Sequence, residues 1–152
     1  MKIRIDIDDT VNETEVTIRC KTIDAKVAQM QKMLSDADAT NAKIRLTKAG
    51  REYYLMPEDI LFFEAQDGHT WAHTTHDAFE SKLRLYELEA LLPHSFLRVS
   101  KSAIVGTEHI YAIEKNPFGP STVEFRDSHK KISVSRQYFR ILYDKLNGAK
   151  TR

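Results

Sequence analysis

Residues 60–75 read ILFFEAQDGHTWAHTT and carry the clearest strand–turn–strand pattern in the chain. The apolar run at 60–63 has the length of a buried strand, and Asp67-Gly68 is a strong signal for a two-residue hairpin turn. Residues 69–75 then form the return strand. An antiparallel hairpin is therefore expected here.

The same two-residue period extends to both sides of this hairpin. Upstream, residues 44–46 and 53–55 alternate apolar and polar side chains around Ala49-Gly50, which predicts another hairpin. Downstream, turn signals separate further short apolar stretches, and strands are expected at 96–99, 102–105, 110–114, 122–126 and 131–134.

Helical spacing of apolar residues is confined to a few segments. A central helix is predicted over 78–92, where Pro93 ends it, and a closing helix over 136–147, where Gly148 follows. The chain as a whole is therefore predicted to be mainly β, of the α+β class, with few helices.

The first forty residues are predicted to form a small β-β-α unit. Strands are expected at 2–7 and 15–20, and a helix is expected from Thr22, a candidate N-cap, to about Ser35.

The small, polar stretch 36–42 is interpreted as a linker. It divides the chain into an N-terminal extension, residues 1–40, and a main domain, residues 43–147.

Charge is distributed unevenly along the 152 residues. The formal net charge is only +1, but residues 1–40 carry −2, residues 41–97 carry −3 and residues 98–152 carry +6. A concentrated basic segment in a nearly neutral protein is typical of a phosphate-binding face, although a solvated surface has the same composition.

Composition also narrows the location and the class of protein. No run approaches the roughly 18 apolar residues of a membrane span, and Cys20 is a lone cysteine, which excludes an internal disulfide. A cytoplasmic protein is expected. The five glycines form no phosphate-binding loop and no serine sits in a nucleophile elbow, so neither an enzyme nor a cofactor is predicted.

The histidines at 69, 73 and 76 have zinc-ligand spacing only if they lie on a helix. They follow an Asp-Gly turn in a threonine-rich stretch, which favours a strand. His69 and His73 would then be about 13 Å apart, too far to share one zinc. No metal site is predicted.

The basic segment is the strongest candidate for a binding site. Its cations alternate with hydroxyl side chains, a mixture that supplies donors to phosphate oxygens, and an arginine has the fork that reads guanine. The residues concerned are Arg98, Ser100, Lys101, Ser102, Lys130, Lys131, Ser133, Ser135, Arg136, Tyr138 and Arg140.

Several sequence pieces, in order, resemble the LytTR DNA-binding domain of bacterial regulators. The resemblance covers about residues 43–146, and the pieces are DILFFE at 59–64, LEALLP at 88–93, FLRVSKSAIV at 96–105 and ISVSR at 132–136. It implies an elongated, mainly β domain of some ten strands whose loops, not a recognition helix, enter successive major grooves of duplex DNA.

The resemblance also implies roles for individual residues. By position, His69 and Arg136 are similar to the residues that contact bases. Lys101 and Ser102 are similar to residues that contact phosphates, with Arg98 or Lys131 assisting.

One position departs from the family pattern. The asparagine that often follows the Ile-Val pair is replaced by Gly106, which implies loss of a base or backbone contact and puts the sequence preference in doubt.

No receiver domain fits in the first forty residues, so the chain is similar to stand-alone family members. Such members typically bind direct repeats as homodimers and are often paired with a membrane protein. Met30, Met33 and Leu34 are then candidate dimer or partner contacts, although packing on the main domain explains them equally well.

Two other hypotheses remain open. One is a protein-interaction module that binds a membrane-protein partner without DNA. The weaker one is a metal-dependent hydrolase built on the histidines.

Overall fold

The computed structural model describes residues 1–12, 14–39 and 42–148. In this part of the chain the helices are α1 (Ala25–Ala39), α2 (Leu85–Leu91) and α3 (Arg136–Leu146), with short 3-10 turns η1 (Pro57–Asp59) and η2 (Thr107–His109). The strands are β1 (Ile44–Lys48), β2 (Arg51–Leu55), β3 (Phe62–Gln66), β4 (His69–His73), β5 (Ala78–Ser81), β6 (Phe96–Ser100), β7 (Ala103–Gly106), β8 (Ile110–Glu114), β9 (Ser121–Phe125) and β10 (Lys131–Val134).

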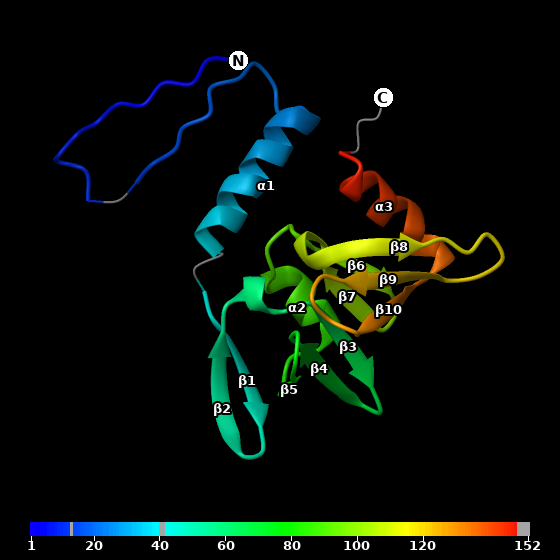
Figure 1. Cartoon of the computed structure of the whole chain (residues 1–152). Coiled ribbons are helices and arrows are strands. Elements are labelled where there is room, and N and C mark those ends of the chain that lie inside the picture. Colours follow the sequence, from blue (N-terminus) through cyan, green and yellow to red (C-terminus); the bar gives the residue numbers. More distant parts are fainter. Residues whose placement is uncertain (13, 40–41, 149–152) are drawn as a thin grey trace.

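The strands form two antiparallel sheets (Figure 1). A seven-stranded sheet has the order β2-β1-β5-β4-β3-β7-β6, and a three-stranded sheet has the order β10-β9-β8. This confirms the mainly β prediction and the hairpins around Ala49-Gly50 and Asp67-Gly68. Asp67 and Gly68 have φ of 53° and 79°, positive values at both central residues that match the right-handed twist of the flanking strands.

The central strands β3 and β7 of the seven-stranded sheet are buried on both faces, and successive side chains of each strand enter opposite cores. Phe62 and Val105 face the three-stranded sheet and α3, where they join a core with Val123 and Leu142. The core on the other face lies beneath α2, and its members include Phe63, Ile104, Phe79 and Leu88. The continuous apolar run at 60–63 is explained by this double burial.

The predicted helix over 78–92 is wrong in its first half. Residues 78–81 form β5, which pairs with β4 so that Phe79 lies opposite Ala72, and the helix begins only at Leu85. Local helical spacing was overridden by the pairing of β5 with a sheet that also buries Phe79.

The N-terminal β-β-α prediction is also corrected. Residues 1–12 and 14–24 contain no strand. They extend away from the sheets and return to the start of α1 (Figure 1). An isolated two-stranded hairpin is marginal in water, and here no third strand lies against it. Helix α1 begins at Ala25, where the Asp24 carboxylate accepts a 2.9 Å hydrogen bond from the Val27 N–H, and it runs on to Ala39 through most of the predicted linker.

Helix α1 is tied to the main domain by Asp36. Its carboxylate accepts a 2.8 Å hydrogen bond from the His94 backbone N–H and lies 2.9 Å from His94 Nδ1. Met33 and Leu34 stay 48% and 42% exposed on the same helix. None of the helices that the structure describes is long and apolar enough to cross a membrane.

Candidate nucleic-acid interface

His69 is the first residue of β4 and stands directly after the Asp67-Gly68 turn. It pairs with Gln66 across the hairpin, and its exposed imidazole is held by the Glu80 carboxylate, 2.6 Å from Nδ1. Because a carboxylate only accepts, Nδ1 donates in this contact and Nε2 remains as the second polar atom of the ring. The hairpin tip therefore presents an oriented imidazole.

The turn between β6 and β7 carries Lys101 and Ser102. Its shape is fixed by Arg98, whose guanidinium donates to the carbonyls of Ser100, at 2.7 Å, and Lys101, at 2.6 Å, and also pairs with Glu89. Within the turn the Ser102 N–H donates to the Ser100 hydroxyl at 3.1 Å. The Lys101 ammonium makes no ion pair with any described residue.

Two backbone hydrogen bonds bring separate loops to one end of the domain. The Ala65 N–H donates to the Ser102 carbonyl at 2.8 Å, which places the β6–β7 turn beside the β3–β4 hairpin. The Ser135 N–H donates to the Val99 carbonyl at 2.9 Å, which places the start of α3 beside the same turn. His69, Lys101, Ser102 and Arg136 therefore share this end of the molecule.

Arg136 is the exposed first residue of α3. A cation in the first turn of a helix is disfavoured by the helix dipole, so intrahelical electrostatics does not explain its presence. Arg136 makes no ion pair within the described part of the chain. Its guanidinium is therefore available to an external ligand.

The loop between β8 and β9 joins the same end and was overlooked by sequence reasoning, which took its prolines only as turn signals. Together with Arg136 it lines a hollow of about 450 Å³, whose other residues are Lys115, Asn116, Pro117, Gly119, Ser121 and Phe139. At its tip Phe118 is 90% exposed. The available signal in the sequence was a lysine and an aromatic residue within one proline- and glycine-containing turn, KNPFGP at 115–120.

Lys131 and Arg98 are placed differently from the other candidates. Lys131 is at the start of β10, about 10 Å along the strand from the end that adjoins Val99, and its ammonium lies 3.5 Å from the Glu124 carboxylate. Arg98 uses its guanidinium to donate hydrogen bonds to the carbonyls of the β6–β7 turn. The structure thus separates these two from the exposed cations of the candidate interface.

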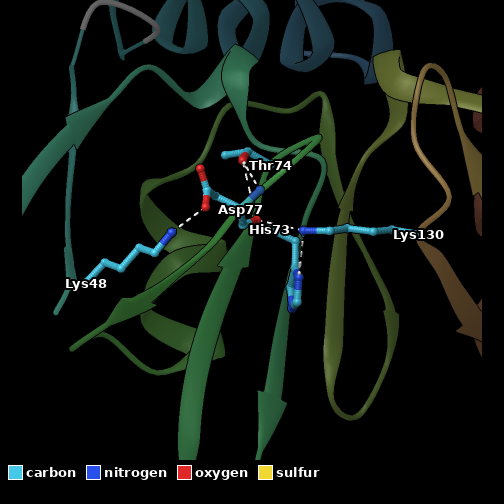
Figure 2. A network of polar contacts seen from close by, with 5 residues as sticks. All are labelled: Lys48, His73, Thr74, Asp77 and Lys130. Atoms are coloured by element: carbon cyan, nitrogen blue, oxygen red, sulfur yellow. Dashed lines mark hydrogen bonds and ion pairs between the residues drawn. The ribbon is translucent and has the colours of Figure 1, made fainter.

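The basic segment also contributes Lys130 to an internal network at the opposite end of β4 (Figure 2). The Lys130 ammonium donates to the Asp77 carbonyl at 2.7 Å and lies 3.4 Å from His73 Nδ1, while Lys48 pairs with the Asp77 carboxylate. The β4–β5 loop is closed by the Thr74 N–H, which donates to the same carbonyl at 2.9 Å. This lysine ties the two sheets together.

The electrostatics of this network follow from burial. His73 stacks on Phe62 with ring centroids 4.3 Å apart, and burial lowers the pKa of its imidazole to about 4, with the Lys130 charge acting in the same direction. Burial likewise lowers the pKa of Lys130. The Lys48 hydrogen bond lowers the pKa of Asp77.

Gly106 lies away from the exposed end. It is buried at the far end of β7, where an added Cβ would stand 3.1 Å from the Ile60 carbonyl oxygen and 3.3 Å from that of Leu61. Glycine is therefore explained by close approach of β7 to residues 60 and 61, which lead into β3, and this position is about 10 Å along β7 from the turn that carries Lys101.

The histidines do not form a metal centre in the described residues, in which no group of three or more His, Cys, Asp or Glu side chains is arranged to hold a metal ion. His69 and His73 stand at the two ends of β4, as the strand prediction required.

Lys101, Lys115 and Arg136 place exposed positive charge at one end of a domain built on two β-sheets. The model of the LytTr DNA-binding domain family matches residues 50–147, and the chain belongs to this family. It is a family of DNA-binding domains and not an enzyme family.

Solved and curated relatives agree. A solved LytTr DNA-binding domain from Bacillus cereus matches 70% of this chain and 97% of its own length, with a TM-score of 0.63 and 26% identity. An uncharacterized HTH-type transcriptional regulator of Staphylococcus aureus strain NCTC 8325 is 28% identical over 97% of this chain and 99% of its own. The one from the bovine strain RF122 is 29% identical with the same coverage.

The names of those relatives refer to a helix-turn-helix motif, and the fold of this chain differs from that motif. Strands separate α1, α2 and α3 from one another along the chain, so no two of the described helices are joined by the short turn of a helix-turn-helix motif.

Proposed function

We propose that this protein is a cytoplasmic, sequence-specific transcription regulator that reads duplex DNA with the loops at one end of its β domain. His69 and Arg136 contact base edges in the major groove, and Lys101 and Ser102 contact phosphates. The observation that carries the proposal is the pair of backbone hydrogen bonds, from Ala65 to Ser102 and from Ser135 to Val99, which gathers these loops.

Sheet geometry supports this division of roles. Strand β4 is two strand spacings from β7, so His69 and the β6–β7 turn are separated by about 10 Å. The major groove is about 12 Å wide. A hairpin tip that enters the groove therefore leaves the neighbouring turn over the phosphate backbone, where a lysine and a hydroxyl are suitable ligands.

Arg136 suits a guanine, because its guanidinium can donate two parallel hydrogen bonds to O6 and N7. With Nδ1 of His69 held by Glu80, Nε2 is the ring atom left to contact a base edge. We further propose that two copies bind direct repeats, since one set of loops reads only a short segment, and that a membrane protein regulates the complex.

The test is a fluorescence-anisotropy titration of the full chain with the duplex immediately upstream of its own gene and with a scrambled duplex of equal length. It is carried out at low and at near-physiological salt. Tighter binding to the upstream duplex, with affinity that falls steeply as salt rises, is expected. Equal, salt-insensitive binding to both would contradict the proposal and favour the protein-interaction module.

A further inference from the structure

Residues 2–8, with the sequence KIRIDID, are an exposed strip that the main domain does not use. Ile3, Ile5 and Ile7 are 81%, 83% and 96% exposed, and none of them joins either hydrophobic core of the described residues. Arg4 Nε and Asp6 Oδ1 lie 2.9 Å apart, so alternate charged side chains share one side of the extended chain. Three neighbouring isoleucines exposed together mark a surface that another element covers.

The segment is outside the DNA-binding match, whereas the longer alignments extend into the N-terminal part of the chain. The family model begins at residue 50, whereas the Staphylococcus aureus relatives align over 97% of this chain. Similarity that extends so far beyond the DNA-binding domain indicates a shared task for the N-terminal part other than contact with DNA.

The charges of this strip complement a second copy of itself. An antiparallel pair centred on Ile5 places Arg4 opposite Asp6 of the second copy, Lys2 opposite Asp8, and Ile3 opposite Ile7. A local two-fold axis, which relates only the two paired strands, repeats each pair, as an isologous contact requires. Opposite charges directly across a strand pair are stabilising and like charges are destabilising.

Other registers fail the same criterion. A shift of two residues in one direction sets Arg4 opposite Arg4, and a shift in the other direction sets Asp6 opposite Asp6. Parallel, in-register pairing sets Arg4 opposite Arg4 and also Asp6 opposite Asp6. The sequence KIRIDID therefore favours one antiparallel register, in which all isoleucines also lie on one face.

We propose that residues 2–8 are a dimerisation strand that pairs antiparallel with residues 2–8 of a second copy about a two-fold axis at Ile5. Residues 15–20 of each copy flank this central pair, which supplies the third and fourth strands that a two-stranded ribbon lacks. In the single chain residues 2–8 and 15–20 form no strand, because a two-stranded ribbon alone is marginal and the strands that complete the sheet belong to the second copy. The inference rests on the two copies of the proposed function and places the contact between them, and its test uses no DNA.

The first measurement is the mass of the full chain in solution by size-exclusion chromatography with light scattering. We expect a dimer for the wild type and monomers for Arg4→Asp and Asp6→Arg, with the dimer dissociation constant raised by about tenfold or more. Lys26→Asp, an exposed charge reversal on α1, serves as the control that stays dimeric.

Mixing the two monomeric variants provides the sharper test. An Arg4→Asp chain paired with an Asp6→Arg chain regains opposite charges at both contacts between chains, while each chain keeps like charges at its own positions 4 and 6. We therefore expect the mixture to form a heterodimer. A mixture that stays monomeric overturns the proposal, as does a monomeric wild type or a dimer that survives either single change.

Disulfide trapping tests the register. In a Cys20→Ser background, Ile5→Cys faces itself across the axis and is expected to cross-link under mild oxidation, since directly opposite Cα atoms are about 5 Å apart. Lys2→Cys is the matched control, because its two copies are then about 20 Å apart along the strands. Cross-linking of Lys2→Cys equal to that of Ile5→Cys contradicts the register.

Discussion

The backbone N–H of Ser135 donates a 2.9 Å hydrogen bond to the carbonyl of Val99. This contact joins the end of β10 in the three-stranded sheet to β6 in the seven-stranded sheet. It fixes the position from which Arg136 projects relative to the turn that carries Lys101 and Ser102. The proposed DNA-binding residues are therefore held by main-chain geometry shared between the sheets.

Replacement of Arg136 by alanine is expected to reduce discrimination between the specific and the scrambled duplex by about 1–3 kcal/mol, because a bidentate contact to a base is lost. The fold should persist, since the side chain is exposed and unpaired among the described residues. Anisotropy titrations with both duplexes measure the effect. Arg140→Ala is the control, because Arg140 lies on the same helix and pairs with Asp144. Unchanged selectivity in Arg136→Ala would remove Arg136 from the interface.

Replacement of Lys101 by alanine is expected to weaken binding to both duplexes alike and to make the slope of log K against log salt shallower by roughly 0.9, the value for one phosphate contact. Affinities at several salt concentrations give the slope. Lys131→Ala should leave it unchanged, because the Lys131 ammonium is paired with Glu124 and lies at the other end of β10. An equally reduced slope in Lys101→Ala and Lys131→Ala would show that the DNA interface extends along β10.

Replacement of Arg98 by lysine is expected to destabilise the domain by about 1–3 kcal/mol and to weaken DNA binding. An ammonium cannot reproduce the fork that bonds the Ser100 and Lys101 carbonyls and Glu89 together. Urea denaturation measures the stability, and binding is compared at a temperature where both proteins are folded. Arg45→Lys, at an exposed pair with Glu52, should change stability little. A fully stable Arg98→Lys protein with normal binding would show that the turn does not depend on this arginine.

Stability is expected to fall as the pH falls from about 6.5 to about 4, partly through His73. Its pKa is about 4 in the folded protein and about 6.5 in the unfolded chain, so the unfolded state takes up a proton first as the solution is acidified. The contribution is present above the unfolded pKa and amounts to at most about 3 kcal/mol.

The check is urea denaturation across this pH range for the wild type and for His73→Phe, which keeps an aromatic ring against Phe62 without a titrating group. The difference in unfolding free energy between the two proteins should change with pH in this window. Parallel pH profiles would exclude His73 as the source.

Much of the strand order along the chain was predictable, because turns and alternation are local. Asp67-Gly68 and Ala49-Gly50 adopt the positive φ values that their hairpins require. The apolar stripe of α3, which includes Phe139 and Leu142, also predicted its helix.

The errors came where neighbouring strands decided the outcome. Residues 78–81 have helical spacing but form β5 because β4 and β1 pair with them on either side. Residues 2–7 alternate like a strand but find no partner strand within the single chain.

For the candidate interface, residue types and local periods specified the individual elements and the kinds of contact each side chain can make. Tertiary structure specified which loops meet. The exposed end that joins His69, Lys101 and Arg136 depends on hydrogen bonds between residues far apart in the chain, and the same packing turned Arg98 and Lys130 inward. Sequence spacing carries no information about such encounters, because they are set by the order of the strands and by the burial of two faces of one sheet.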